Sequence, residues 1–355
     1  MRFPRGRARL MVPAALITLS LAACGGNNSS PAAQPTGSGA ASSPAPSPSP
    51  LPVASLVPNL KATKPYRIAV LFPNAGDPYF QQKAYGYKNE AAKAGASVTF
   101  FDAGGYANIE KQISQIENAT QQKFDAIAIA VTSSTGTVPA LEAAQKAGVL
   151  VVGDGVFPQS DKVLKRGEDS EGAGYNAGKF LCDHLKAGDG VGLLLGPPGI
   201  DLIKLRQDGV QRGLSACPKV KVVKALHNLS DLPSSLAAAE NILQADPNVK
   251  GFYAFNSVVA QAVVQSLRSA GKKPGEVTVT TVDLDPDLEK LMQQGWVQET
   301  SVAGSVLLGR VVVDTIVQKL NGTAVGKEAY LVPRELTPDT LGKLDRSIVY
   351  PPAGS

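Results

Sequence analysis

Short hydrophobic runs alternate with amphipathic stretches along the chain from about residue 64 onwards. The runs at 66–72, 126–131 and 191–195 are rich in β-forming residues, and a segment with helical periodicity follows each of them. Strands that are apolar throughout are typical of sheets covered by helices on both faces. The alternation therefore predicts α/β structure with parallel sheets, and its two successive series predict two doubly wound lobes.

The same pattern gives approximate limits for each element. Strands are expected at 66–72, 97–101, 126–131, 149–152, 191–195, 220–225, 251–255, 277–282 and 329–332. Helices are expected at 78–95, 108–122, 135–147, 172–186, 202–217, 232–245, 258–270 and 306–320.

Polar and aromatic side chains follow several of the expected strands. Ligands of open parallel sheets bind beyond the carboxyl ends of the strands, so these positions are the candidates for binding. The candidate residues are Asp77, Tyr79, Phe80, Asp154, Arg206, Asn256 and Asp283. Such a mixture suits a neutral polyol, whose hydroxyls need both donors and acceptors while its C–H faces pack on aromatic rings.

The first 24 residues have the features of an export signal. Four arginines lie within the first nine positions, and an apolar stretch from 10 to 23 precedes Cys24. This stretch is too short to span a hydrocarbon core of ~30 Å comfortably. The sequence LAAC at 21–24 resembles a bacterial lipobox, which implies a lipid on Cys24 and an exported protein anchored to the cell envelope. The alternative is an ordinary signal peptide with an incidental cysteine.

Residues 25–60 contain no charged residue and are rich in proline, serine and alanine. Such a segment has too little apolar surface to fold and favours extended polyproline geometry. We expect a disordered tether that holds the folded body away from the membrane, in preference to a proline-rich ligand for another protein.

The distribution of charge excludes a nucleic-acid partner. The formal net charge of +5 comes largely from the four arginines of the signal, since the remaining 31 basic and 30 acidic residues leave the body at +1.

The cysteines divide in a similar way. Once Cys24 is assigned to the anchor, Cys182 and Cys217 remain, and in an exported protein we expect them to form a disulfide. Two buried free thiols are the alternative.

The sequence offers no catalytic or metal-binding motif. Asp283-x-Asp285-x-Asp287 begins like a calcium loop but has Leu288 where the loop needs glycine, so Asp285 and Asp287 are expected to cap a helix. A G-x-S-x-G elbow, a Cys–His pairing and a metal-ligand cluster are all absent. We expect no enzyme activity, no metal and no cofactor.

A series of motifs resembles the type I periplasmic binding proteins of the ribose-binding class. These are IAVLFP at 68–73, DPYF at 77–80, GYNAGK at 174–179, RQDGV at 206–210 and VD at 282–283. The resemblance implies that Asp77, Asp154, Arg206, Asn256 and Asp283 bond ligand hydroxyls and that Tyr79 and Phe80 sandwich the ring. Gly155 and Ala303 stand where that class often has arginine and glutamine, so we expect a ligand other than ribose.

The chain path of that class implies lobes of 64–168 plus 304–332 and of 169–303 plus 333–350, joined by three crossovers that act as a hinge. It also implies a monomer that delivers a sugar or sugar-like solute to an ABC importer.

Other segments of the chain resemble a second kind of protein that has the same fold. DAGGYAN at 102–108, LLLGP at 193–197 and LTPDTL at 336–341 are similar to the periplasmic protein of a trimethylamine-N-oxide sensing system. This implies a methylamine ligand, bound through cation–π contacts that include Tyr106 and Phe157, and a membrane histidine kinase as partner.

Overall fold

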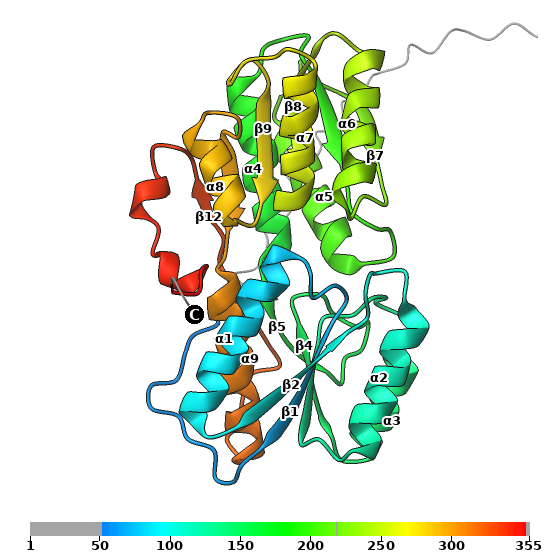
Figure 1. Ribbon diagram of the computed structural model, residues 1–355, viewed down its shortest axis with the longest axis vertical. Helices are drawn as coiled ribbons and strands as arrows, with labels where there is room; N and C mark the ends of the chain where they lie inside the picture. The colour runs from blue at the N-terminus through cyan, green and yellow to red at the C-terminus, as the bar shows by residue number, and fades with distance from the viewer. Residues whose placement is uncertain (1–51, 218, 353–355) are drawn as a thin grey trace, which may run out of the picture. The chain divides into compact units, whose positions relative to one another are not determined.

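A computed structural model describes residues 52–217 and 219–352, which form two sheets flanked by helices (Figure 1). All strands of the first sheet are parallel. In spatial order they are β11 (Glu328–Leu331), β5 (Leu164–Glu168), β4 (Leu150–Asp154), β3 (Ala126–Ile129), β1 (Arg67–Phe72) and β2 (Ser97–Asp102). The helices of this lobe are α1 (Pro78–Ala94), α2 (Ile109–Gln121), α3 (Val138–Lys146) and α9 (Ser305–Leu320).

The second sheet repeats this plan, except that its strand β12 is antiparallel to β10. Its spatial order is β12 (Arg334–Leu336), β10 (Glu299–Val302), β9 (Thr278–Val282), β8 (Val249–Ala254), β6 (Gly190–Leu194) and β7 (Lys221–Leu226). Its helices are α4 (Ser170–His184), α5 (Asp201–Ser215), α6 (Leu232–Ala245), α7 (Ser257–Ser269) and α8 (Pro286–Gln293). Two short 3₁₀ helices, Leu341–Lys343 and Arg346–Ile348, follow β12.

The chain passes between the lobes three times. It leaves the first lobe between β5 and α4, returns between β10 and α9, and crosses again between β11 and β12. The strand order therefore combines segments that are far apart in the sequence. This arrangement brings the carboxyl ends of the parallel strands of both sheets toward the junction of the lobes (Figure 1).

Glycines allow the closest helix packing in both lobes. A β-carbon on Gly174 in α4 would lie 2.1 Å from the carbonyl oxygen of Arg206 in α5. A β-carbon on Gly86 in α1 would lie 2.2 Å from the carbonyl oxygen of Val306 in α9. Side chains at these positions would force the helices apart. The glycine-rich start of α4 is thus a packing surface.

The segment of residues 52–60, called the strap below, precedes β1 and corrects one expectation. The tether was expected to be disordered to residue 60, but residues 52–60 lie against the first lobe. Tyr330 N–H donates to the carbonyl of Pro52 at 2.8 Å, and Ala54 N–H donates to the carbonyl of Tyr330 at 3.0 Å. Val57 N–H also donates to Asp314 at 2.7 Å. Residues 25–51 of the expected tether, and Cys24 with the expected signal, lie outside the described residues.

The expected disulfide is present in the second lobe. Cys182 at the end of α4 and Cys217 after α5 are bonded, with Cα atoms 5.5 Å apart. The bond ties together the outer ends of two helices whose glycines already pack closely.

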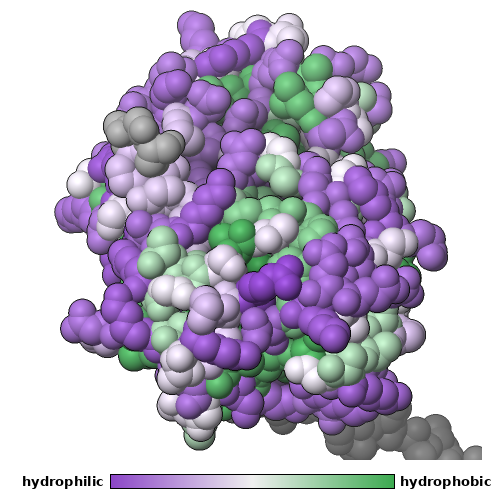
Figure 2. Space-filling view, turned by 60° about the horizontal axis from the view of Figure 1, so that its bottom comes forward, coloured by the Kyte–Doolittle hydropathy of each residue, from purple (hydrophilic) through white to green (hydrophobic). Residues whose placement is uncertain are grey.

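On the face shown in Figure 2 the surface is mostly hydrophilic, with a smaller central group of hydrophobic residues. Among the described residues no helix is both long enough and apolar enough to cross a membrane.

Candidate functional site

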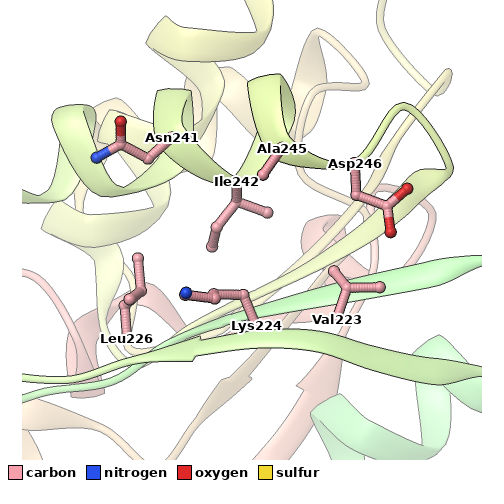
Figure 3. A pocket seen from close by; sticks show the side chains of 7 residues that line it. All are labelled: Val223, Lys224, Leu226, Asn241, Ile242, Ala245 and Asp246. Atoms are coloured by element: carbon pink, nitrogen blue, oxygen red, sulfur yellow. The ribbon is translucent and has the colours of Figure 1, made fainter.

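One open cavity lies within the second lobe, between β7 and α6. It has a volume of about 540 Å³, and Val223, Leu226 and Ile242 form much of its wall. Lys224, Asn241 and Asp246 supply its polar groups (Figure 3). Since β7 is the edge strand of its sheet and the first lobe contributes no residue, this cavity does not occupy the position where ligands of parallel sheets bind.

A second cavity lies between the lobes and contains most of the predicted site residues. Its volume is about 40 Å³. The first lobe contributes Asp77, Tyr79, Phe80, Tyr106, Gly155 and Val156, and the second contributes Leu202, Ile203, Arg206, Phe255, Asn256 and Asp283. Of the predicted ligand-binding residues, only Asp154 is not part of this lining.

Two of the lining polar residues also cap helices. Asp77 accepts a hydrogen bond from Tyr79 N–H at 2.9 Å at the start of α1. The Asn256 side-chain oxygen accepts from Val259 N–H at 3.0 Å at the start of α7. Capping with one oxygen fixes both side chains at the cavity wall. The second carboxylate oxygen of Asp77 and the side-chain NH2 group of Asn256 take no part in the capping.

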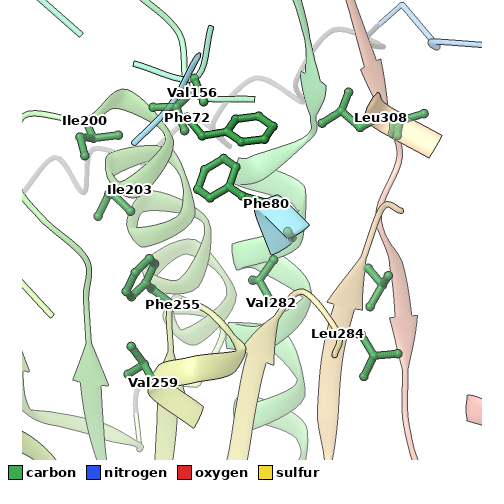
Figure 4. Packing of buried hydrophobic residues seen from close by; sticks show 14 of the residues in the cluster. Phe72, Phe80, Val156, Ile200, Ile203, Phe255, Val259, Val282, Leu284 and Leu308 are labelled. Atoms are coloured by element: carbon green, nitrogen blue, oxygen red, sulfur yellow. The ribbon is translucent and has the colours of Figure 1, made fainter. Parts of the chain in front are cut away.

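Aromatic and aliphatic side chains of both lobes meet around the cavity (Figure 4). Phe80 packs against Phe72 in the first lobe, with ring centroids 4.9 Å apart. Phe255 and Ile203 are the buried apolar residues of the second lobe that line the same cavity. Apolar walls of this kind can pack on the C–H faces of a sugar.

Arg206 is the central cation of the site. Its guanidinium donates to the carbonyl of Phe255 at 2.6 Å and forms an ion pair with Glu168, which ends β5. A second carboxylate partner of the guanidinium, Asp283, lies farther away, at 3.4 Å. Within the described residues the buried Nε of Arg206 has no hydrogen-bond partner. The guanidinium is thus held mainly by Glu168, with one donor left unused.

Asp283 follows β9 in a left-handed backbone conformation, with φ of 73°. Its N–H donates to the carbonyl of Ser301 at 3.1 Å, and its carbonyl accepts from the Thr300 hydroxyl at 2.5 Å. Burial raises the pKa of Asp283 to about 7, although Arg206 opposes the shift. Burial likewise raises the pKa of Asp77 to about 6. Both carboxyl groups that line the cavity therefore lack full compensation by a cation.

Asp154 lies beneath the cavity wall instead of facing the cavity. It forms an ion pair with Lys83 at 2.6 Å, in which both side chains are fully buried. The Tyr87 hydroxyl donates to its other oxygen at 2.8 Å. Because this geometry commits Asp154 to Lys83 and Tyr87, the expectation of a direct bond to ligand is not supported by its position.

Three further expectations concern residues around the site. Tyr106 lines the cavity, whereas Phe157 packs against Tyr330 with ring centroids 6.1 Å apart. Asp285 caps α8 by accepting from the N–H groups of Asp287 and Leu288. In the described ranges no group of three or more His, Cys, Asp and Glu residues is placed to hold a metal ion.

Comparison with known proteins agrees with this architecture. The family model described as "Periplasmic binding protein domain" matches residues 68–324. The chain belongs to this family.

Two curated relatives and one solved structure illustrate the similarity to other periplasmic binding proteins. The D-allose-binding periplasmic protein of Escherichia coli K12 is 27% identical over 65% of this chain and 77% of its own length. The ribose import binding protein RbsB of Bacillus subtilis 168 is 28% identical over 74% of this chain and 85% of its own. The crystal structure of a sugar ABC transport system substrate-binding protein from Bordetella parapertussis 12822 has a TM-score of 0.78 at 21% identity, covering 84% of this chain and 98% of its own.

The family match makes the chain a protein of the periplasmic binding type, and the relatives that it resembles are binding proteins and not enzymes. The two-lobed fold expected from the strand–helix alternation is confirmed.

Sequence reasoning missed two charged residues of this binding site. Glu168 ends a strand at the lobe junction, and the rule that selects strand ends would have found it if β5 had been recognised. Lys83 lies in the middle of α1, where a lysine is normally solvated, and no sequence signal marks it as buried.

The raised pKa of Asp283 predicts a specific pH dependence. A carboxyl whose folded pKa is about 7 retains its proton between pH 4 and 7, where the unfolded chain has lost it. The ligand-free protein therefore loses stability through Asp283 as the pH rises across this window. The groups that face it are Arg206, Glu168 and Asp77.

Asp283→Asn should remove this contribution. Measured by urea unfolding, the stability of the variant relative to the unaltered protein should increase by more than about 1 kcal/mol between pH 4.5 and 7.5. Asp246→Asn, at the separate cavity of Figure 3, is the matched control and should show no such change. Equal pH profiles for Asp283→Asn and the unaltered protein would contradict the assigned environment.

Proposed function

We propose that this protein captures a sugar or sugar-like solute between its lobes and delivers it to an ABC importer. The observation that carries the proposal is the interlobe cavity, where aromatic rings and hydrogen-bonding side chains from both lobes converge. Hydroxyl groups would pair with Asp77, Asn256 and Asp283, while the ring would pack on Phe80 and Phe255.

The two curated relatives described above support a sugar ligand, because their names assign D-allose binding and ribose import to them. The ribose-binding class that this chain resembles often has an arginine and a glutamine that hold ribose. Gly155 and Ala303 stand at those positions here. A ligand that needs fewer donors at those positions fits this site better than ribose does. The chain is also 25% identical, over 75% of its length, to the periplasmic protein TorT of Escherichia coli K12, which bears on the alternative of a sensor-kinase partner. The printed names of the two relatives above favour sugar capture and import.

Hinge motion is the mechanism of capture that the contacts favour. The cavity volume of about 40 Å³ holds only about three water molecules, so a sugar requires wider separation of the lobes. Besides the apolar contacts around the cavity, hydrogen bonds cross the junction. Gln82 donates to the carbonyl of Leu284 at 3.0 Å, and Asp201 N–H donates to the Ser134 hydroxyl at 3.2 Å. A ligand that bonds both lobes would shift the population toward a closed form that the importer recognises.

Membrane anchoring belongs to the same proposal. Its support is the lipobox-like sequence that ends at Cys24, together with the uncharged, proline-rich segment that follows. The strap at residues 52–60 would then set the point at which the tether leaves the first lobe.

Thermal-shift measurements on the full-length protein in detergent test the binding function. A panel of pentoses, hexoses and polyols should contain a compound that raises Tm, since a ligand at 100 times its Kd adds about 2.7 kcal/mol of stability. Asn256→Ser keeps an oxygen that can cap α7 but removes the amide, so it should reduce the shift. Asn241→Ser, at the β7–α6 cavity, is the control and should leave it unchanged. A panel without any stabilising compound would argue against sugar capture.

A further inference from the structure

The interlobe site contains more carboxylates than cations. The carboxylates are Asp77, Asp154, Glu168 and Asp283, and the cations are Lys83 and Arg206. Each cation has one close partner. Lys83 is committed to Asp154 at 2.6 Å, and Arg206 is committed to Glu168. Of the other two carboxylates, Asp283 has only longer contacts with Arg206, at 3.4 and 3.5 Å, and Asp77 has no ion pair among the described residues.

The two remaining carboxylates are the ones that line the cavity. Asp283 reaches Arg206 only at 3.4 Å, outside the short range of a strong charge-assisted hydrogen bond. Asp77 has no ion pair among the described residues, and its bond from Tyr79 N–H compensates it only in part. Asp285 caps α8 nearby and adds a further negative charge that acts on Asp77. The negative charge of the site is thus concentrated where a ligand would lie.

A buried carboxylate without a cation is stabilised by hydrogen-bond donors, by a bound positive group or by taking up a proton, and of these a bound positive group compensates its charge most directly. The cavity wall also carries the rings of Tyr79, Phe80, Tyr106 and Phe255, which attract cations through their faces. In contrast, the unused Nε–H of Arg206 requires an acceptor such as a hydroxyl oxygen. A ligand that satisfies both demands has an ammonium group and hydroxyl groups on one small ring.

We propose that the solute is an amino sugar or aminocyclitol, whose protonated amine lies between Asp77 and Asp283 while a ring hydroxyl accepts from Arg206. This inference rests on the proposed function of solute capture between the lobes and names the chemical class of the solute. In this arrangement the second lobe, through Asp283 and Arg206, binds both the amine and the hydroxyl. The first lobe, through Asp77, completes the pairing of the amine when the lobes close.

The protonation behaviour of the two carboxyl groups is consistent with this assignment. Burial raises the pKa of Asp77 to about 6 and that of Asp283 to about 7. A bound ammonium would favour the ionised form of both groups.

Isothermal titration calorimetry of the full-length protein in detergent at pH 7.0 tests the proposal with matched ligands. The compounds are the three series based on glucose, galactose and mannose, each with its 2-amino and its N-acetyl derivative. The N-acetyl compounds keep the nitrogen but carry no charge. In at least one series the amine should bind at least about ten-fold more tightly than both neutral members, since a lost charge pairing of about 1.4 kcal/mol corresponds to that factor.

Isosteric variants locate the charge that recognises the amine. Asp283→Asn and Asp77→Asn keep hydrogen-bonding capacity and should each reduce amine affinity at least about ten-fold, with a smaller effect on the neutral sugars. Asp246→Asn, which alters a carboxylate at the β7–α6 cavity, is the control and should leave amine affinity unchanged.

The outcomes separate this inference from the function on which it rests. If neutral sugars bind as tightly as their amines in every series that binds, the amine assignment is overturned while sugar capture is supported. If no compound of any series binds but the thermal-shift panel contains a stabilising neutral sugar or polyol, the amine assignment is overturned and solute capture stands; if neither measurement finds a ligand, both proposals are contradicted. If an amine binds tightly but Asp77→Asn and Asp283→Asn leave its affinity unchanged, the placement of the ammonium between them is wrong.

Discussion

Arg206→Met should lower the free energy of unfolding at pH 7.5 by about 3–5 kcal/mol and abolish ligand binding. The reason is the pair of carboxylates that the guanidinium serves. Without it, Glu168 and Asp283 remain buried with no cation between them, and the carbonyl of Phe255 loses its donor at 2.6 Å. Urea unfolding measures the loss of stability, and calorimetry with any ligand that stabilises the protein measures the loss of binding.

A second arginine provides the matched control for this experiment. Arg346 forms an ion pair with Glu289 at 2.6 Å, but its side chain is 44% exposed. Arg346→Met should therefore cost less than about 1 kcal/mol. Adding Glu168→Gln to Arg206→Met should restore part of the lost stability by removing one of the two stranded charges. Equal effects of the two arginine substitutions would contradict the role given to Arg206.

The periodicity of the sequence predicted most of the fold because most elements have an apolar core-facing side. Helix α6, for example, covers Leu232–Ala245 as expected. Strand β5 was missed because it is not an apolar run. Its Arg166 is buried, and the guanidinium donates to the Thr315 hydroxyl at 2.8 Å and to the carbonyl of Gly326 at 2.8 Å. A polar strand residue that is satisfied by distant segments leaves no periodic signal.

The part of the candidate site that could be predicted consists of the residues whose place is set by the strand topology. Residues such as Asn256 and Asp283 follow a strand, and the parallel arrangement places them at the lobe junction whatever their detailed contacts. Ion pairing depends instead on tertiary contacts. Lys83 is separated from Asp154 by 71 residues, and Glu168 from Arg206 by 38. The excess of negative charge at the cavity therefore becomes apparent only when the two pairs are seen in three dimensions.

Lys83→Met is expected to produce the second large effect, a loss of about 3–5 kcal/mol of stability at pH 7.5. Its Nζ lies 2.6 Å from Asp154, both side chains are fully buried, and Tyr87 is the other hydrogen-bond donor to that carboxylate. The substitution leaves a charge in an apolar layer that includes Phe72 and Phe80. Urea unfolding at pH 7.5 measures the loss of stability.

The same helix offers the control, since Lys93→Met removes a lysine whose side chain is 57% exposed and whose partner Glu90 lies at 3.2 Å. That change should cost less than about 0.5 kcal/mol. Combining Lys83→Met with Asp154→Asn should recover much of the stability, because the stranded charge is then absent. If Asp154 instead serves the ligand directly, the double variant will be stable but will lose binding. Retained binding would mean that the Lys83–Asp154 pair supports the cavity wall and that Asp77 and Asp283 alone supply the carboxylates for the ligand.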